Sequence, residues 1–99
     1  MKKAFPVVID KPRSLRYGLV ALEMAEEALD KSISEIDLNK IRLKEVAVLV
    51  WAGLQHEDDT LSPKDILKLF DDHDADYVKI LEVVSEAISD AFDLKEEKK

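Results

Sequence analysis

The chain has 99 residues, of which 46% are hydrophobic, and it carries a formal net charge of −7 at pH 7. This length predicts a single domain, residues 1–99, with one modest hydrophobic core. The absence of cysteine excludes disulfides, a thiolate nucleophile and a zinc site built on sulfur. No apolar run reaches the roughly 18–20 residues that a membrane-spanning helix requires, so we expect no membrane partner.

Residues 4–17 predict a small β-hairpin. Residues 5–10 alternate weakly and are rich in β-branched side chains, Pro12 lies in a turn signal, and residues 14–17 form the expected returning strand. Pro6 favours an edge strand, because proline lacks the backbone N–H that a central strand donates. The apolar part of this segment is too short for the core of a signal peptide, which indicates a protein that is not exported.

Residues 19–94 predict a helical body. The first helix covers residues 19–30, where leucine and alanine recur at helical spacing and glutamates occupy the other positions. The second covers about residues 40–55 and contains the only nearly all-apolar run of the chain, residues 46–54. The alternating valines of this run also fit a buried strand, but the length of the pattern favours a helix.

The second half of the body predicts two more helices. Ser62 and Pro63 are a strong helix start, since serine caps a helix and proline fits its first position. The aspartates of residues 71–74 end this third helix, and the last helix runs from about residue 76 to 94, followed by a frayed tail at residues 95–99. The apolar stripe of the last helix consists of Tyr77, Leu81, Val84, Ile88 and Phe92.

Helix caps are expected at two further places. Asp37 or Asn39 precedes the second helix, and Asp74 or Asp76 precedes the last one. Helices joined by short loops pack as a bundle, here around the most apolar member. The predicted fold is therefore mainly α with a small N-terminal β-hairpin, a compact bundle of about four helices centred on the second.

Catalytic and metal-binding patterns are weak. His56 and His73 both lie in acidic segments, so a divalent metal site shared by the two loops is an alternative to two solvated loops. Residues 72–83 begin like a calcium loop, but Tyr77 stands at its required glycine and Val83 at its closing glutamate. No glycine-rich phosphate loop or nucleophile elbow is present in the sequence. We expect no enzyme activity, no catalytic residues, no metal and no cofactor.

Charge is unevenly distributed along the chain. Residues 1–18 hold five basic side chains and one acid, whereas residues 19–99 hold ten basic and 21 acidic groups. An acidic body repels a phosphate backbone, so we expect no direct binding of nucleic acid. The basic N-terminal segment either pairs with the acidic body of its own chain or faces an acidic partner.

Five segments, taken in order, match the pattern of a known family. They are Leu15-Arg16-Tyr17-Gly18, Ala21-Leu22-Glu23, Trp51-Ala52-Gly53-Leu54-Gln55-His56-Glu57-Asp58, Leu61-Ser62-Pro63, and Ser85-Glu86-Ala87 through Ala91-Phe92. The chain resembles the small tail assembly chaperones of long-tailed, siphovirus-like bacteriophages, prophages and gene transfer agents. The resemblance spans about residues 5–93, and the third segment is its most specific part.

The resemblance implies a non-catalytic role in virion morphogenesis. Such chaperones bind the tape-measure protein, a long helical chain that sets tail length, until tail-tube protein subunits replace them. They act in the bacterial host cytoplasm and are not expected in the mature virion. Many are also made in a longer form by a programmed frameshift, and Lys98-Lys99 is compatible with a slippery codon pair.

A chaperone of this kind needs an apolar surface for an amphipathic helix. The candidate partner-binding residues are Trp51, Leu54, Phe92 and Leu94. Trp51 fits two interpretations, a core anchor or a partly exposed aromatic at the mouth of a groove, and Gly53 favours a close helix–helix crossing. The opposite charges of the N-terminal segment and the body are compatible with self-association, which the resemblance also implies.

Two other functions compete with this one. An acidic inhibitor would mimic nucleic acid and block a DNA-binding enzyme, which the strongly acidic body favours. Such a mimic would place its carboxylates on one face at phosphate-like spacing, whereas these acids flank helices and loops. A regulator that senses metal through the two His/Asp loops is the third interpretation, and its melting temperature would change on addition of calcium or zinc.

Overall fold

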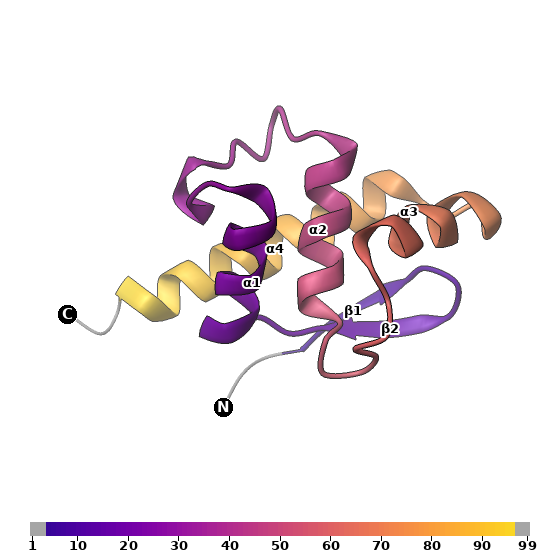
Figure 1. Ribbon diagram of the computed structural model, residues 1–99, viewed down its shortest axis with the longest axis horizontal. Helices are drawn as coiled ribbons and strands as arrows, with labels where there is room; N and C mark the ends of the chain where they lie inside the picture. The colour runs from indigo at the N-terminus through magenta and orange to yellow at the C-terminus, as the bar shows by residue number, and fades with distance from the viewer. Residues whose placement is uncertain (1–3, 97–99) are drawn as a thin grey trace.

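The computed structural model describes residues 4–96, with side chains described through residue 91, and it begins with an antiparallel hairpin (Figure 1). Strand β1, Phe5–Val8, pairs with β2, Pro12–Leu15, and Phe5 lies opposite Leu15. The predicted hairpin is confirmed, but its second strand begins two residues earlier than expected. Pro12 is tolerated there because its backbone points away from β1, so its missing N–H removes no bond between the strands.

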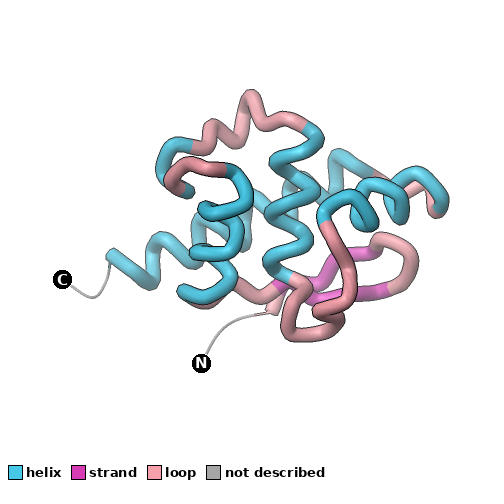
Figure 2. The backbone as a smooth tube through the Cα atoms, in the orientation of Figure 1, coloured by secondary structure: helices cyan, strands magenta, loops and turns pink. Residues whose placement is uncertain are grey.

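Four α-helices follow within the described residues, with a short 3-10 helix after the first (Figure 2). In chain order the elements are α1 (Leu19–Leu29), η1 (Ile33–Glu35), α2 (Leu43–Gly53), α3 (Pro63–Asp72) and α4 (Tyr77–Glu96). The predicted fold class, a mostly helical bundle with an N-terminal hairpin, is confirmed. The last helix runs two residues beyond its predicted end, into the predicted tail, and residues 97–99 lie outside the described residues.

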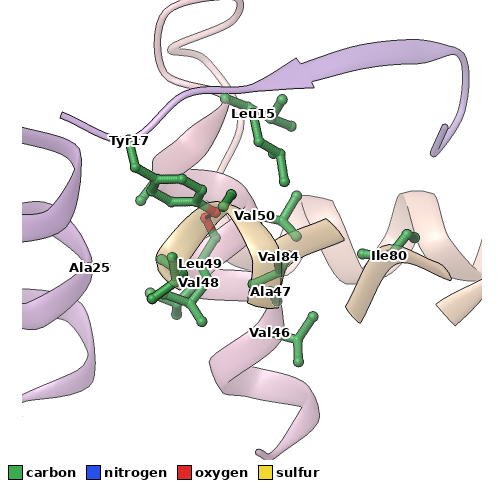
Figure 3. Close-up of a cluster of buried hydrophobic side chains, with 14 of the residues drawn as sticks. Leu15, Tyr17, Ala25, Val46, Ala47, Val48, Leu49, Val50, Ile80 and Val84 are labelled. Atoms are coloured by element: carbon green, nitrogen blue, oxygen red, sulfur yellow. Dashed lines mark hydrogen bonds between the residues drawn. The ribbon is translucent and has the colours of Figure 1, made fainter. Parts of the chain in front are cut away.

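Helix α2 is the centre of the bundle. It contacts α1, α3, α4 and β2, and every side chain from Val46 to Val50 is buried (Figure 1). Figure 3 shows these side chains meeting Leu15 and Tyr17 of the hairpin segment and Val84 of α4. Leu43, by contrast, is 60% exposed, because it begins the helix at the edge of the bundle.

The caps differ from expectation at one of the two helices. Helix α2 begins at Leu43, later than predicted, and Glu45 caps it by accepting a hydrogen bond from the Arg42 N–H at 3.0 Å. Asp37 instead accepts from the Asn39 N–H at 2.9 Å and closes a separate turn, so neither predicted cap is correct. At α4, Asp76 is the cap, because its carboxylate accepts from the Lys79 N–H at 3.2 Å.

Candidate functional site

Two of the five motif segments, residues 15–18 and 51–58, meet at the C-terminal end of α2. The Tyr17 hydroxyl donates to the Leu49 carbonyl at 2.5 Å (Figure 3), and the Arg16 N–H donates to the Gly53 carbonyl at 2.9 Å. A Cβ on Gly53 would lie 2.8 Å from Tyr17 Cζ, closer than real side chains approach. The close approach predicted at Gly53 is therefore present, but its partner is the end of the hairpin and not another helix.

The turn after α2 covers the outer edge of β2. The Ser14 N–H donates to Glu57 Oε2 at 2.9 Å, and His56 Nε2 lies 2.8 Å from the Ser14 carbonyl oxygen. Together with the Arg16–Gly53 bond, these contacts engage both outward backbone groups of Ser14 and the N–H of Arg16, just after β2. A loop that covers a strand edge in this way hinders pairing with another chain. His56 and Glu57 therefore have a structural role in joining the hairpin to α2.

A buried arginine completes this junction. The Arg13 side chain is only 7% exposed and makes two hydrogen bonds to the Asp10 carboxylate, at 2.7 and 2.9 Å, with Glu57 at 3.8 Å. These bonds from Arg13 hold the pKa of Asp10 below its usual value, against the opposing effect of burial. Arg13 thus pairs mainly with Asp10 of its own N-terminal segment, and among the described residues its contact with the acidic body, the pairing that one of the two interpretations predicted, is with Glu57 at 3.8 Å.

The four predicted partner-binding residues do not form one described surface. Trp51 is half-buried and packs against the core, which leaves part of its ring at the surface. Leu54 is completely buried, so it contributes to the core and offers no surface to a partner. Leu54 follows the last turn of α2, where the chain folds back under the hairpin. The predictions for Phe92 and Leu94 concern side chains outside the described ones.

A groove lies between β1 and α4, and it was not predicted from the sequence. It has a volume of about 300 Å³, and its lining is mostly apolar. Residues of β1, of the loop before α4 and of the first turns of α4 line it, among them Pro6, Val8, Ala75, Lys79 and Val83. Its two sides come from elements about 70 positions apart in the chain, so no local pattern reveals it. The only sequence feature that could have indicated the groove was an apolar residue, Val8, on a strand that Pro6 marks as an edge strand.

Several large apolar side chains are more than half exposed. They are Val8, Leu19, Val20, Leu43 and Val78. Leu19 and Val20 are neighbours in the first turn of α1, whereas Val8 lies in β1 and Val78 in the first turn of α4. Only Leu19 and Val20 are neighbours; apolar side chains scattered singly are normal on a protein surface, so α1 offers the one adjacent pair among them.

Among the described residues, no three histidine or carboxylate side chains lie together in a way that would hold a metal ion. A second, smaller hollow of about 180 Å³ lies between η1, the following loop and α4, and Ile33, Leu49 and Ile88 contribute to it.

No described helix has the length and apolarity needed to cross a membrane.

Comparison with known proteins does not identify a family. No model of a known protein family, no curated protein and no solved structure matches this chain. The function must therefore be argued from the motifs in the sequence and from the surfaces that the fold leaves open.

Proposed function

We propose that this chain is a tail assembly chaperone of a long-tailed bacteriophage, prophage or gene transfer agent. It binds the tape-measure protein, and then yields it to tail-tube subunits, without catalysing a reaction. It acts in the cytoplasm of the bacterial host and is absent from the mature virion. One observation carries the proposal: two of the motif segments, residues 15–18 and 51–58, the second of them the most specific, contact each other through Arg16, Tyr17 and Gly53. A motif whose parts are physically interdependent is a stronger basis for resemblance than scattered similarities.

The surface is compatible with a chaperone role. Five exposed large aliphatic side chains, a half-buried Trp51 and an apolar groove offer contact area to an amphipathic helix. Carboxylates are exposed on α1, on the loops and on α4, and Asp74 and Asp76 line the groove itself. Charges at the rim of an apolar contact set specificity more than strength, which suits a partner that must later be displaced.

The sole tryptophan gives a direct test. Trp51 is half-buried, so its fluorescence should shift to shorter wavelength when a partner covers it. We expect titration with helical fragments of the tape-measure chain encoded by the same genome to produce this shift and a saturable complex. A double variant, Leu19→Ser with Val20→Ser, should weaken binding if α1 contributes to the surface, with Lys44→Ser as an exposed control on α2. Failure of every tape-measure fragment to bind would refute the proposal.

The alternative function, an acidic inhibitor that mimics nucleic acid, is favoured by one feature of α4. Glu82 and Glu86 are exposed and four residues apart, which places them about 6 Å apart along the helix axis. Other exposed acids, such as Glu23 on α1 and Asp59 after α2, belong to separate elements. Binding to a nuclease that duplex DNA abolishes, without binding to tape-measure fragments, would favour the inhibitor.

A further inference from the structure

The hairpin has two unequal edges. Along β1, hydrogen bonds to the second strand alternate with positions that point outward. The Ile9 N–H donates to the Lys11 carbonyl at 3.2 Å, so Ile9 points inward, and the preceding Val8 points outward. The N–H and carbonyl of Ser14 both contact the turn after α2, at Glu57 and His56. Ser14 therefore lies at an outward position of β2, opposite Pro6. Pro6 and Val8 therefore direct their backbone groups away from β2.

Only the edge of β2 is covered. Ser14 and Arg16 are bonded to the segment that follows α2, as described above. In contrast, the strand register directs the N–H and carbonyl of Val8 and the carbonyl of Pro6 away from β2, and no hydrogen bond from turns, loops or side chains among the described residues engages them. Pro6 has no N–H, so the open edge of β1 offers one donor, at Val8, and two acceptors. Unpaired strand edges of this kind are templates for another strand.

The groove runs along this open edge. Helix α4 contacts β1, and the groove is lined by residues from both faces of the strand: Pro6 and Val8 on one face, Val7 and Ile9 on the other. Pro12, which lies opposite Val8 on β2, closes the end of the groove near the hairpin turn. Lining from both faces is expected of a groove that follows an edge, because successive side chains of a strand point to opposite faces. Its opposite wall consists of Ala75, Lys79 and Val83.

We propose that this groove binds an extended peptide segment of a partner protein, which adds as a third strand to β1. The Val8 N–H donates to a carbonyl of the peptide, and the Val8 and Pro6 carbonyls accept from its N–H groups. Apolar side chains of the peptide pack against Ala75 and Val83. This inference goes beyond the proposed function, which concerns a helical partner, and it holds whether or not that function does.

The charges at the mouth of the groove indicate a basic segment. Asp74 and Asp76 stand there against the single Lys79, with His73 beside them, and the whole chain carries a net charge of −7. A peptide with a lysine or arginine at one end is attracted to this mouth. A second copy of the chain is a poor occupant, since it brings the same net charge and the same Pro6, so that two Val8 N–H groups would be the only donors between the two edges.

The probe is a capped hexapeptide of alternating valine and threonine with a lysine at one end, added to the ¹⁵N-labelled full chain. In the free chain we expect the Val8 amide to exchange with solvent almost without protection. Saturating peptide should slow that exchange at least tenfold and shift resonances of residues 6–9 and 75–83. A peptide N-methylated at alternate amides, which cannot form the new strand, serves as the matched ligand control.

Two variants at one position isolate the backbone donor. Val8→Pro removes the outward N–H and should weaken binding at least tenfold, whereas Val8→Thr keeps it and should bind within twofold of the native chain. Val8 is 65% exposed, and Pro6 already occupies the equivalent outward position, so the fold tolerates proline there. Unchanged urea unfolding followed by Trp51 fluorescence verifies this. Asp74→Asn, which keeps its backbone conformation, should weaken binding several-fold and reduce the dependence of binding on salt.

Four results would overturn the proposal. They are protection of the Val8 amide in the free dilute chain, equal binding by Val8→Pro, equal binding of the N-methylated peptide, and no binding of the probe at millimolar concentration. Protection of Val8 that grows with protein concentration in the absence of peptide would instead assign the edge to a second copy of this chain.

Discussion

At the scale of single residues, two aspartates hold a backbone conformation that favours glycine. Asp30 after α1 has a φ of 57°, and Asp74 after α3 has a φ of 50°. The Ala75 N–H donates to the Phe70 carbonyl at 3.0 Å, and the equivalent bond after α1 joins Lys31 to Glu26 at 3.3 Å. These bonds are those of a helix end that turns left-handed, where glycine is the usual residue. A carboxylate there is also unfavourable, because the C-terminal end of a helix carries partial negative charge.

Replacing either aspartate with glycine should therefore stabilise the protein. Asp30→Gly and Asp74→Gly are each expected to raise the free energy of unfolding by about 0.5–1 kcal/mol, measured by urea denaturation. Asp30→Ala removes the same charge but cannot relieve the backbone, so it should not stabilise. Equal gains for glycine and alanine at residue 30 would show that charge alone matters.

The pairing of Asp10 with Arg13 makes stability depend on pH. Arg13 lowers the pKa of Asp10 in the folded chain, so the folded state binds this proton more weakly than the unfolded state does. The stabilisation that the ionised Asp10 gives the folded chain is fully present above its unfolded pKa of about 4. This stabilisation is lost as the pH falls through the lower folded pKa.

Asp10→Asn should accordingly cost about 1–3 kcal/mol at neutral pH, because it weakens the bonds to a buried guanidinium. The difference from the native chain should shrink as the pH falls through the lowered folded pKa of Asp10, because the native carboxylate is then protonated too. Urea midpoints at neutral and at acid pH measure this. Asp59→Asn, at an exposed turn, is the control and should change stability by less than about 0.5 kcal/mol at either pH. A cost that persists at the acid pH would contradict the assignment to charge.

At the scale of elements, the contact between the hairpin and α2 depends on a glycine. A methyl group at residue 53 would approach Tyr17 Oη to 2.9 Å and Leu15 Cδ2 to 3.2 Å. Gly53→Ala is expected to destabilise the chain by about 1–3 kcal/mol, even though alanine is the better helix former. In a Tyr17→Leu background, which removes the ring atoms that the methyl meets, the cost of Gly53→Ala should be clearly smaller. If Gly53→Ala cost the same in the native and Tyr17→Leu chains, the added methyl group would clash with an atom other than those of the Tyr17 ring.

The elements themselves were largely predictable, since each depends on local pattern. Ser62 caps α3 and Pro63 opens it, as expected from residue type alone. The stripe of α4 was predicted less well. Its fully buried centre is Ile80 and Val84, whereas Leu81, expected at the centre, is only half-buried. Helical spacing identifies an apolar side, but the angle at which α4 crosses α2 and β1 decides which residues of that side are sealed.

At the scale of the whole molecule, the hairpin and the helices share one core. Val7, Ile9, Leu15 and Tyr17 of the N-terminal segment are buried in the same cluster as the side chains of α2 and α4. Because the hairpin and the helices share this core, the prediction that residues 1–99 form a single domain can be tested by unfolding. Urea unfolding followed by Trp51 fluorescence, by far-UV circular dichroism and by the NMR signals of Val7 should give coincident transitions. An earlier transition for Val7 would mean that the hairpin folds separately.

The candidate sites were less predictable than the core. Leu54 was expected at a partner-binding surface, yet it is completely buried. The 53–57 segment instead joins β2 to α2, through bonds that link residues more than 35 positions apart. Such pairings leave no periodic trace in the sequence, so they follow only from the assembled fold.

The sequence by itself determined the helices, the hairpin, their order and the central place of residues 46–50, because these depend on spacing, capping and apolar content over short stretches. Tertiary structure alone decided which edge of the hairpin is covered, what meets Gly53 and where the groove lies. These features arise where distant segments pack together, and the free energy of that packing is not encoded in any one of them.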